Sequence, residues 1–355
     1  MIKRMKETLN VGLIGYGFAG KTFHAPVITC VPGLALAKVV ERRTDHAKRD
    51  YPQVEIARDV KELYADPEID IVVVTTPSTD HFTFARDALL AGKHVVVEKP
   101  FTVTSAEADE LIALAKERGL VLSVFHNRRW DGDFMTVREI VRGGRLGRIV
   151  SAEFRWDRYN PHPVPGRWRE SAAPGAGVWY DLGSHFVDQA LQLFGTPQTI
   201  RADIRTQREG VAADDCFDVT LGYESGLAVR LYASAIARTP GPRYRLNGTS
   251  GSFVKYGEDP QENALKAGGR PADPGWGRDP EANWGTLDIM QDGLRFTGKV
   301  ETLPGAYQNY FANVRDAVNG VAEPAVKPEE ARAVIRMIEL GFRSSREGRT
   351  IEVAL

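Results

Sequence analysis

The strongest constraint on the fold is a glycine pattern near the N-terminus. The apolar run Val11–Ile14 leads into Gly15, Gly17 and Gly20, spaced as G-x-G-x-x-G, and a helical pattern over Lys21–Cys30 follows. A strand, this loop and a helix in that order are typical of the pyrophosphate-binding turn of a dinucleotide-binding domain. The predicted cofactor contacts of the loop are Gly15, Gly17, Phe18, Ala19 and Gly20.

The residues after the second predicted strand indicate which dinucleotide binds. Strand Leu34–Val40 is followed by Glu41, Arg42 and Arg43, about twenty residues after the glycines, where the adenosine ribose is recognised. A carboxylate suits the free 2′-hydroxyl of NAD, whereas guanidinium groups suit the 2′-phosphate of NADP. The same charges could simply solvate a loop. We expect NADP, with NAD as the alternative.

Strands and helices alternate over the rest of the first third of the chain. This alternation predicts βαβ crossovers and a parallel sheet with helices on both faces, a doubly wound Rossmann fold. The expected strands are Ile69–Thr75, His94–Val97 and Val121–Phe125, and the expected helices are His81–Ala91 and Ser105–Arg118.

Two strand ends in this region carry candidate site residues. Ligands of open α/β sheets bind outside the carboxyl ends of the strands. Thr76 and Pro77 follow one strand, and Glu98 and Lys99 follow the next, so we expect all four to face the cofactor. His81, at the start of the following helix, is a further candidate cofactor contact. A strand-end lysine is otherwise often a solvated loop charge.

The second half of the chain predicts an α+β domain with a large, open, mostly antiparallel sheet. Its apolar positions alternate with period two, as in Phe217, Val219 and Leu221, which indicates a sheet with one covered face. Helices are expected at Phe134–Arg142 and Val178–Phe194. The segment Asp259–Trp284 is rich in Pro and Gly and is expected to be a long ordered loop.

These patterns predict three segments. Residues 1–126 form the dinucleotide-binding domain, and residues 127–328 form the α+β domain, one sheet face of which is left for a partner subunit or solvent. Residues 329–355 contain a last helix, over Glu329–Glu347, which is expected to pack back on the first domain.

An acid and a base lie four residues apart in the second half. Asp181 and His185 would project from one side of a helix, and a carboxylate beside an imidazole supports proton transfer. An ordinary surface pair is the alternative. A metal site that adds Asp188 lacks a supporting His or Cys cluster, so we expect no metal.

The amino-acid composition limits the kinds of partner that the chain is expected to bind. Lys and Arg number 46 against 47 Asp and Glu, a net charge of −1, which gives no reason to expect nucleic acid or an anionic membrane as a partner. Two cysteines, Cys30 and Cys216, cannot form a disulfide scaffold. The apolar run after the N-terminus is too short for a signal or membrane segment, so a cytoplasmic protein is expected.

Three motifs together resemble the Gfo/Idh/MocA family of nicotinamide-dependent sugar and polyol dehydrogenases. They are Gly15-x-Gly17-x-x-Gly20, Glu98-Lys99-Pro100 and Asp181-Leu182-Gly183-x-His185. Further stretches, among them Arg167-Trp168-Arg169-Glu170 and Gly241-Pro242-Arg243-Tyr244, are most similar to the NADP-dependent scyllo-inositol dehydrogenases of that family.

The resemblance implies a catalytic set and a substrate class. Lys99 would hydrogen-bond the reacting oxygen, Asp181 would orient the substrate and the imidazole, and His185 would move the proton. The substrate would be a cyclic polyol or sugar, and the chain would form a homodimer or homotetramer through its open sheet. A dehydrogenase for aldoses or other sugars, or a non-catalytic dinucleotide-binding sensor on the same fold, are the alternatives. Candidate pocket walls are Trp130, Tyr159, Asn160, His162 and Trp168.

Overall fold

The computed structural model describes residues 6–164 and 166–355, and the chain divides into two compact units. Unit 1 contains the residues up to Trp130 together with Gln261–Trp276 and Ala306–Arg332. Unit 2 contains Asp131–Pro260, Gly277–Gly305 and Ala333–Leu355. The predicted boundary lies at residue 126, whereas the first segment of unit 1 ends at Trp130 and two later segments also belong to unit 1.

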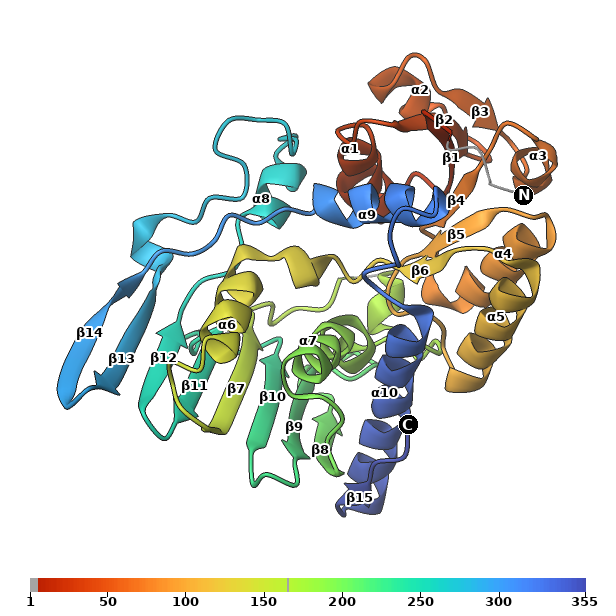
Figure 1. Ribbon diagram of the computed structural model, residues 1–355. Coiled ribbons are helices and arrows are strands. Elements are labelled where there is room, and N and C mark those ends of the chain that lie inside the picture. Colours follow the sequence, from red (N-terminus) through yellow and green to blue (C-terminus); the bar gives the residue numbers. More distant parts are fainter. Residues whose placement is uncertain (1–5, 165) are drawn as a thin grey trace. The chain divides into compact units, whose positions relative to one another are not determined.

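Unit 1 is built on a parallel sheet, which in the described residues has six strands in the order β3-β2-β1-β4-β5-β6 (Figure 1). The sequence of β4 is Ile-Val-Val-Val and that of β5 is His-Val-Val-Val, and every residue of both is buried, as expected for strands covered on both faces. The strands are β1 (Leu9–Ile14), β2 (Leu34–Val40), β3 (Glu55–Ala57), β4 (Ile71–Val74), β5 (His94–Val97) and β6 (Leu122–Val124).

The strand order reverses direction between β1 and β4, the switch point at which open α/β sheets bind ligands. The glycine motif follows β1 and opens a π-helical turn, Gly20–His24, which continues as α1. Helix α5 begins with a capping box between Thr104 and Glu107. The helices are α1 (Ala25–Ile28), α2 (His46–Asp50), α3 (Val60–Ala65), α4 (Ser78–Leu90), α5 (Ser105–Arg118), α8 (Gln261–Lys266) and α9 (Gln308–Val318).

Unit 2 contains a larger mixed sheet. Its described strands number nine, in the order β14-β13-β12-β11-β7-β10-β9-β8-β15; β7 and β10 run parallel, and the other neighbouring pairs run antiparallel. The strands are β7 (Ile149–Asp157), β8 (Thr199–Arg205), β9 (Cys216–Gly222), β10 (Ala228–Ser234), β11 (Tyr244–Gly248), β12 (Gly251–Lys255), β13 (Gly285–Gln291), β14 (Leu294–Val300) and β15 (Ile351–Glu352).

Helices α6 (Gly132–Arg142), α7 (Ser184–Phe194) and α10 (Pro328–Glu347) lie on one side of this sheet (Figure 1). Phe217, Val219 and Leu221 of β9 are buried beneath them, as the period-two pattern predicts. The ring of Phe217 packs against Trp179 at 4.9 Å between centroids. The fold class is therefore confirmed: a Rossmann sheet plus an α+β domain with a mostly antiparallel sheet.

The prediction of a loop over Asp259–Trp284 is wrong, because this segment contains α8, and its part Gln261–Trp276 belongs to unit 1. The predicted last segment, 329–355, is divided between the units: its residues up to Arg332 belong to unit 1, and Ala333–Leu355 belongs to unit 2. Apolar residues of α10 such as Met337 and Ile338 join the core of unit 2, and β15 extends its sheet beside β8. No helix in the described part of the chain is long and apolar enough to span a bilayer.

Candidate cofactor and active site

The glycine loop is shaped by backbone geometry that its three glycines permit. Gly15 has a φ of +95°, in the region that favours glycine. The hydroxyl of Thr75, just after β4, lies 2.8 Å from the carbonyl oxygen of Gly15 and donates to it. A Cβ on Gly20 would lie 2.3 Å from that same oxygen, whereas a Cβ on Gly17 would meet no described atom within 4 Å. The loop is thus closed at Gly20 and open toward a ligand at Gly17.

A cavity of about 550 Å³ lies at the carboxyl ends of β1, β2 and β4. The hydroxyl oxygen of Thr76, on its wall, is buried and has no hydrogen-bond partner among the described residues, so it is available to a ligand. The lining residues are Ile14, Gly15, Tyr16, Gly17, Val40, Glu41, Arg42, Thr44, Arg58, Asp59, Val60, Thr76 and Phe84.

The carboxylate of Glu41 is used within its own loop. It accepts hydrogen bonds from the Thr44 hydroxyl and from the backbone N–H groups of His46, at 3.2 Å, and Ala47, at 2.6 Å. These bonds hold the loop after β2 and satisfy the first N–H groups of α2. Glu41 is buried, and it stabilises the conformation of the loop after β2, the ribose loop.

The arginines near Glu41 have different positions. Arg42 lines the cavity, whereas Arg43 is exposed and is not among the lining residues. Arg58, which sequence reasoning missed, follows β3 and donates to the carbonyl oxygens of Glu41, at 2.9 Å, and Thr44, at 2.7 Å. Because β3 lies beside β2 in the sheet, Arg58 comes to the same edge, a neighbourhood that requires the strand order.

Three further predicted contacts lie at the edges of this region. Phe18 is 57% exposed, and its ring meets that of Phe23 edge-on. Ala19 immediately precedes the helical turn that begins at Gly20, and Pro77 immediately precedes α4.

The side chain of His81, a predicted cofactor contact, lies against two backbone carbonyl groups. Its side chain is buried, and its two ring nitrogens lie 2.8 Å from the carbonyl oxygen of Pro100 and 3.0 Å from that of Thr76. Burial lowers the pKa of His81, although both carbonyl groups act in the opposite direction. Through these two contacts, His81 connects the loop after β4 to the loop after β5.

Lys99 follows β5 directly, at the carboxyl edge of the parallel sheet, and its peptide bond to Pro100 is cis. Its backbone N–H donates to the carboxylate of Glu98 at 2.9 Å. Burial by itself would raise the pKa of Glu98, but a hydrogen bond from His24 and nearby positive charge outweigh it and lower the pKa. Glu98 is thus held as a carboxylate inside unit 1.

Asp181 and His185 lie in unit 2, on either side of the junction between a π-helical turn and α7. The sequence predicted one continuous helix here. A π-helical turn, Trp179–Gly183, carries Asp181, and α7 begins at Ser184 and places His185 in its first turn. The Asp181 carboxylate forms an ion pair with Arg169 at 3.4 Å. His185 is buried, with 3% of its surface exposed.

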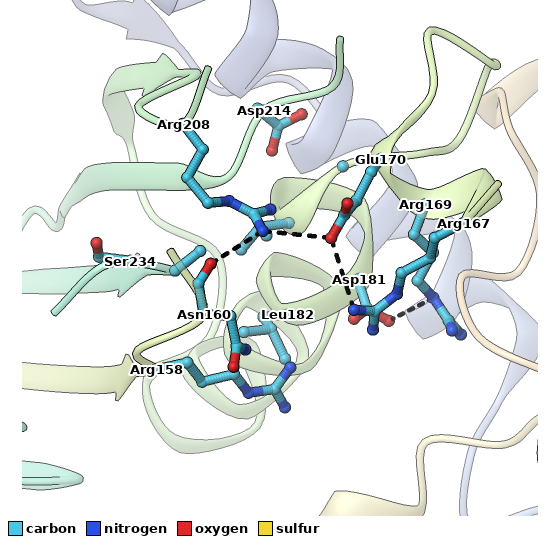
Figure 2. Close-up of a pocket in the computed structure, with 13 residues that line it drawn as sticks. Arg158, Asn160, Arg167, Arg169, Glu170, Asp181, Leu182, Arg208, Asp214 and Ser234 are labelled. Atoms are coloured by element: carbon cyan, nitrogen blue, oxygen red, sulfur yellow. Dashed lines mark hydrogen bonds and ion pairs between the residues drawn. The ribbon is translucent and has the colours of Figure 1, made fainter. Parts of the chain in front are cut away.

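A small cavity of about 50 Å³ has Asp181 on its wall (Figure 2). Arg208 donates to Glu170 at 3.3 Å and to the backbone oxygen of Asn160 at 3.1 Å, and it pairs with Asp215 at 2.8 Å. The other polar lining groups are Arg158, Arg167, Arg169, Asp214 and Ser234. The cavity therefore presents paired charges with both donors and acceptors.

Asp214 fixes the start of the segment that carries Asp181. Its backbone oxygen accepts from Val178 N–H at 2.9 Å, and its carboxylate accepts from Trp179 N–H at 2.6 Å. A Cβ on Gly177, whose φ is +94°, would lie 2.1 Å from an Asp214 carboxylate oxygen. Sequence reasoning missed Asp214, because nothing in its local pattern indicates this contact.

The predicted pocket walls have mixed outcomes. Asn160 lines the cavity of unit 2, but Tyr159, His162 and Trp168 are not among its lining residues. Tyr159 is 44% exposed and lies beneath the guanidinium of Arg238. Trp130 belongs to unit 1, where its ring packs on Tyr310.

Comparison with known proteins places both units in one family. Residues 9–126 match the model of the NAD-binding Rossmann fold of the Gfo/Idh/MocA oxidoreductase family, and residues 138–353 match that of its C-terminal alpha/beta domain. The chain belongs to this family and is an NAD(P)-binding oxidoreductase.

Individual relatives cover nearly the whole chain. The uncharacterized oxidoreductase YdgJ of Escherichia coli K12 is 44% identical over 99% of this chain and 100% of its own. The NADP(+)-dependent scyllo-inositol 2-dehydrogenase IolW of Bacillus subtilis is 40% identical over 98% of this chain and 97% of its own. The solved structure of the Bacillus subtilis protein yvaA superposes with a TM-score of 0.95 at 39% identity, covering 99% of this chain and 100% of that chain.

The residues of unit 1 fit a dinucleotide. Gly17 leaves space for a pyrophosphate, and Thr76 offers a buried hydroxyl. A bound nicotinamide supplies the hydride chemistry. In the described residues no group of three or more His, Cys, Asp or Glu side chains is placed to hold a metal ion.

Proposed function

We propose that the chain is an NADP-dependent dehydrogenase that interconverts a secondary alcohol and a ketone on a cyclic polyol or sugar, with scyllo-inositol as the first candidate. The chemistry of the polar wall beside Asp181, rather than the volume of the small cavity there, supports this proposal. Arg169 and Arg208 on its wall are each paired with a carboxylate, so the wall offers many donors and acceptors and little unbalanced charge. A hydroxyl group both donates and accepts, so a neutral polyol suits such a wall. The 40% identity to a scyllo-inositol dehydrogenase supports the same class.

The preference for NADP rests on the loop after β2. Glu41 would have to turn its carboxylate outward to accept from the ribose hydroxyls of NAD, but three donors within its loop already bind it. Arg42 lines the same cavity and offers a guanidinium to a 2′-phosphate. The identity with an NADP-dependent relative agrees with this assignment.

In this proposal three side chains share the chemistry. The ammonium of Lys99 donates to the reacting oxygen and stabilises negative charge on it, and the imidazole of His185 accepts the hydroxyl proton during oxidation. Asp181 accepts a substrate hydroxyl. Its ion pair with Arg169 limits its rotation.

The test is turnover with purified chain. Oxidation of scyllo-inositol, myo-inositol and glucose is followed by the absorbance of reduced nicotinamide, with NADP and NAD in parallel. We expect the highest kcat/KM with NADP and an inositol, and we expect Lys99→Ala and His185→Ala to lower kcat by roughly two to four orders of magnitude.

Each other outcome has a definite meaning. A higher kcat/KM on glucose would replace inositol by an aldose as substrate class. Tight NADPH binding without turnover of any polyol or ketose, in wild type as in Lys99→Ala, would instead identify a dinucleotide-binding sensor and overturn the proposal.

A further inference from the structure

A buried histidine links the glycine loop to the segment that carries Lys99. His24 is the last residue of the π-helical turn that starts at Gly20, and its side chain is fully buried. Its Nε2 lies 2.7 Å from Oε1 of Glu98, in a different crossover of the same sheet. The rings of Phe125 and Phe311 pack against the imidazole at 4.3 and 5.7 Å between centroids.

The surroundings of His24 define which of its nitrogens carries the hydrogen. Its Nδ1 is buried and has no hydrogen-bond partner among the described residues. A hydrogen on Nδ1 would therefore be a buried donor without an acceptor, whereas a hydrogen on Nε2 is donated to the carboxylate. The Nε2–H tautomer is the one that fits, and His24 acts as a donor to Glu98.

Glu98 connects His24 to the backbone of the next residue, Lys99. Its Oε1 accepts from His24, and its Oε2 accepts from the backbone N–H of Lys99 at 2.9 Å. The backbone N–H of Glu98 donates to Val74 at the end of β4. A carboxylate held at both oxygens and at its own backbone has one orientation, so it fixes the backbone from which the Lys99 side chain projects.

We propose that His24 is a positioning residue that couples occupancy of the glycine loop to the placement of Lys99 through Glu98. The turn Gly20–His24 begins shortly after the open position at Gly17 and ends with the side chain that contacts Glu98, so a ligand that stabilises the turn also stabilises the contact with Glu98. This inference rests on the proposed function for the catalytic role of Lys99, but the contact itself does not.

Two neutral replacements of His24 separate the hydrogen bond from the packing. The amide nitrogen of Gln at position 24 reaches as far as the imidazole Nε2, whereas that of Asn is shorter by one carbon. We expect His24→Gln to retain the donor and His24→Asn to lose it, while both place an amide in the same aromatic surroundings.

The direct measurement is hydrogen exchange of the Lys99 backbone amide, with and without NADPH, in wild type and both variants. In wild type NADPH should slow this exchange by tenfold or more. We expect His24→Asn to exchange at least tenfold faster and to lose the response to NADPH, and His24→Gln to stay within about threefold of wild type. Equal exchange in His24→Asn and wild type would overturn the proposal.

Turnover supplies the second measurement, as a double-mutant cycle. If His24 acts through Lys99, His24→Asn lowers kcat in the wild-type background and has little further effect in a Lys99→Ala background. The same factor in both backgrounds would overturn the proposal. Failure of the proposed function would look different, because polyol turnover would be absent in wild type while the exchange pattern of Lys99 stayed as described.

Discussion

At the residue scale, the pKa of the Asp214 carboxyl group in unit 2 is set by its surroundings. Burial raises the pKa of Asp214 to about 6, and the neighbouring Asp215 adds to this effect, while the hydrogen bond from Trp179 N–H opposes it. The folded chain therefore binds this proton more tightly than the unfolded chain. The resulting stabilisation is fully present below the ordinary pKa of about 4 and is lost as the pH rises through about 6.

Replacing Asp214 by Asn should make the chain more stable at neutral pH. Asn keeps the shape and an oxygen that can accept from Trp179, but it carries no charge. We expect the free energy of unfolding of Asp214→Asn to match that of wild type at pH 4 and to exceed it by roughly 3 kcal/mol at pH 7.5. Urea denaturation at the two pH values measures this, and a difference independent of pH would contradict it.

The ribose loop allows a comparison between adjacent arginines. Arg42 lines the cavity and Arg43 does not, so only Arg42→Ala should remove a partner of the 2′-phosphate. A hydrogen bond to a charged group contributes about 1.5–3 kcal/mol, so the KM for NADP should rise roughly 10- to 100-fold. The KM for NAD should change little. An equal rise in Arg43→Ala would show that the effect comes from general charge rather than from this contact.

The motif residues of the site could be predicted from the sequence, and their partners could not. Lys99, Asp181 and His185 stand in short motifs whose spacing is visible in one dimension. Arg169 meets Asp181 twelve positions along the chain, and His24 meets Glu98 across 74 positions. Such pairs form only after the strands have been ordered, so no local pattern indicates them.

At the scale of elements, two glycines of the turn between β1 and its helix have different roles: Gly20 is needed for packing, and Gly17 for binding. Gly20 is required by the nearby carbonyl oxygen of Gly15, but Gly17 has open space where a Cβ would lie. We expect Gly17→Ala to leave the melting temperature of the free protein unchanged within about 2 °C, since no described contact changes. Its affinity for NADPH should fall at least tenfold, because the Cβ occupies the pyrophosphate space.

The control is Gly20→Ala, in which the new Cβ would lie 2.3 Å from backbone and the melting temperature should fall. Calorimetry and NADPH titration of both variants measure this contrast. Undiminished NADPH affinity in Gly17→Ala would show that the pyrophosphate does not approach this position.

Elements with a strong pattern were predicted, and the weakly patterned hairpin was missed. The bounds of β2 and β5 agree with the predicted Leu34–Val40 and His94–Val97, because both are apolar runs in a buried sheet. Strands β13 and β14 were not predicted, since β14 is exposed over almost its whole length. Their turn did carry a signal: Asp292 and Gly293 have φ values of 51° and 77°, as in the Asp-Gly turns of two-residue hairpins.

At the scale of the whole molecule, β14 lies at the edge of the large sheet and presents Leu294, 63% exposed, and Phe296, 52% exposed. Exposed apolar side chains on an edge strand favour association, and the family resemblance implies self-association through this sheet. We propose a homodimer or homotetramer in which this hairpin is covered by a second copy.

Light scattering during gel filtration tests this proposal. We expect wild type to have the mass of two or four chains and Phe296→Glu to shift toward smaller species. The matched control is Leu90→Glu in α4, which adds the same charge at another exposed apolar residue and should leave the mass unchanged. A monomeric wild type would exclude the proposed oligomer.

Because Ala306–Arg332 belongs to unit 1, the core of unit 1 can be completed only late in synthesis. All six strands of the parallel sheet leave the ribosome before α9 does. Tyr310 and Phe311 of α9 pack on Phe125, beside His24. Until about residue 318 has been made, the Phe125 ring and the His24–Glu98 pair of a nascent chain lack the two α9 rings that cover them, so unit 1 cannot complete its core before that point.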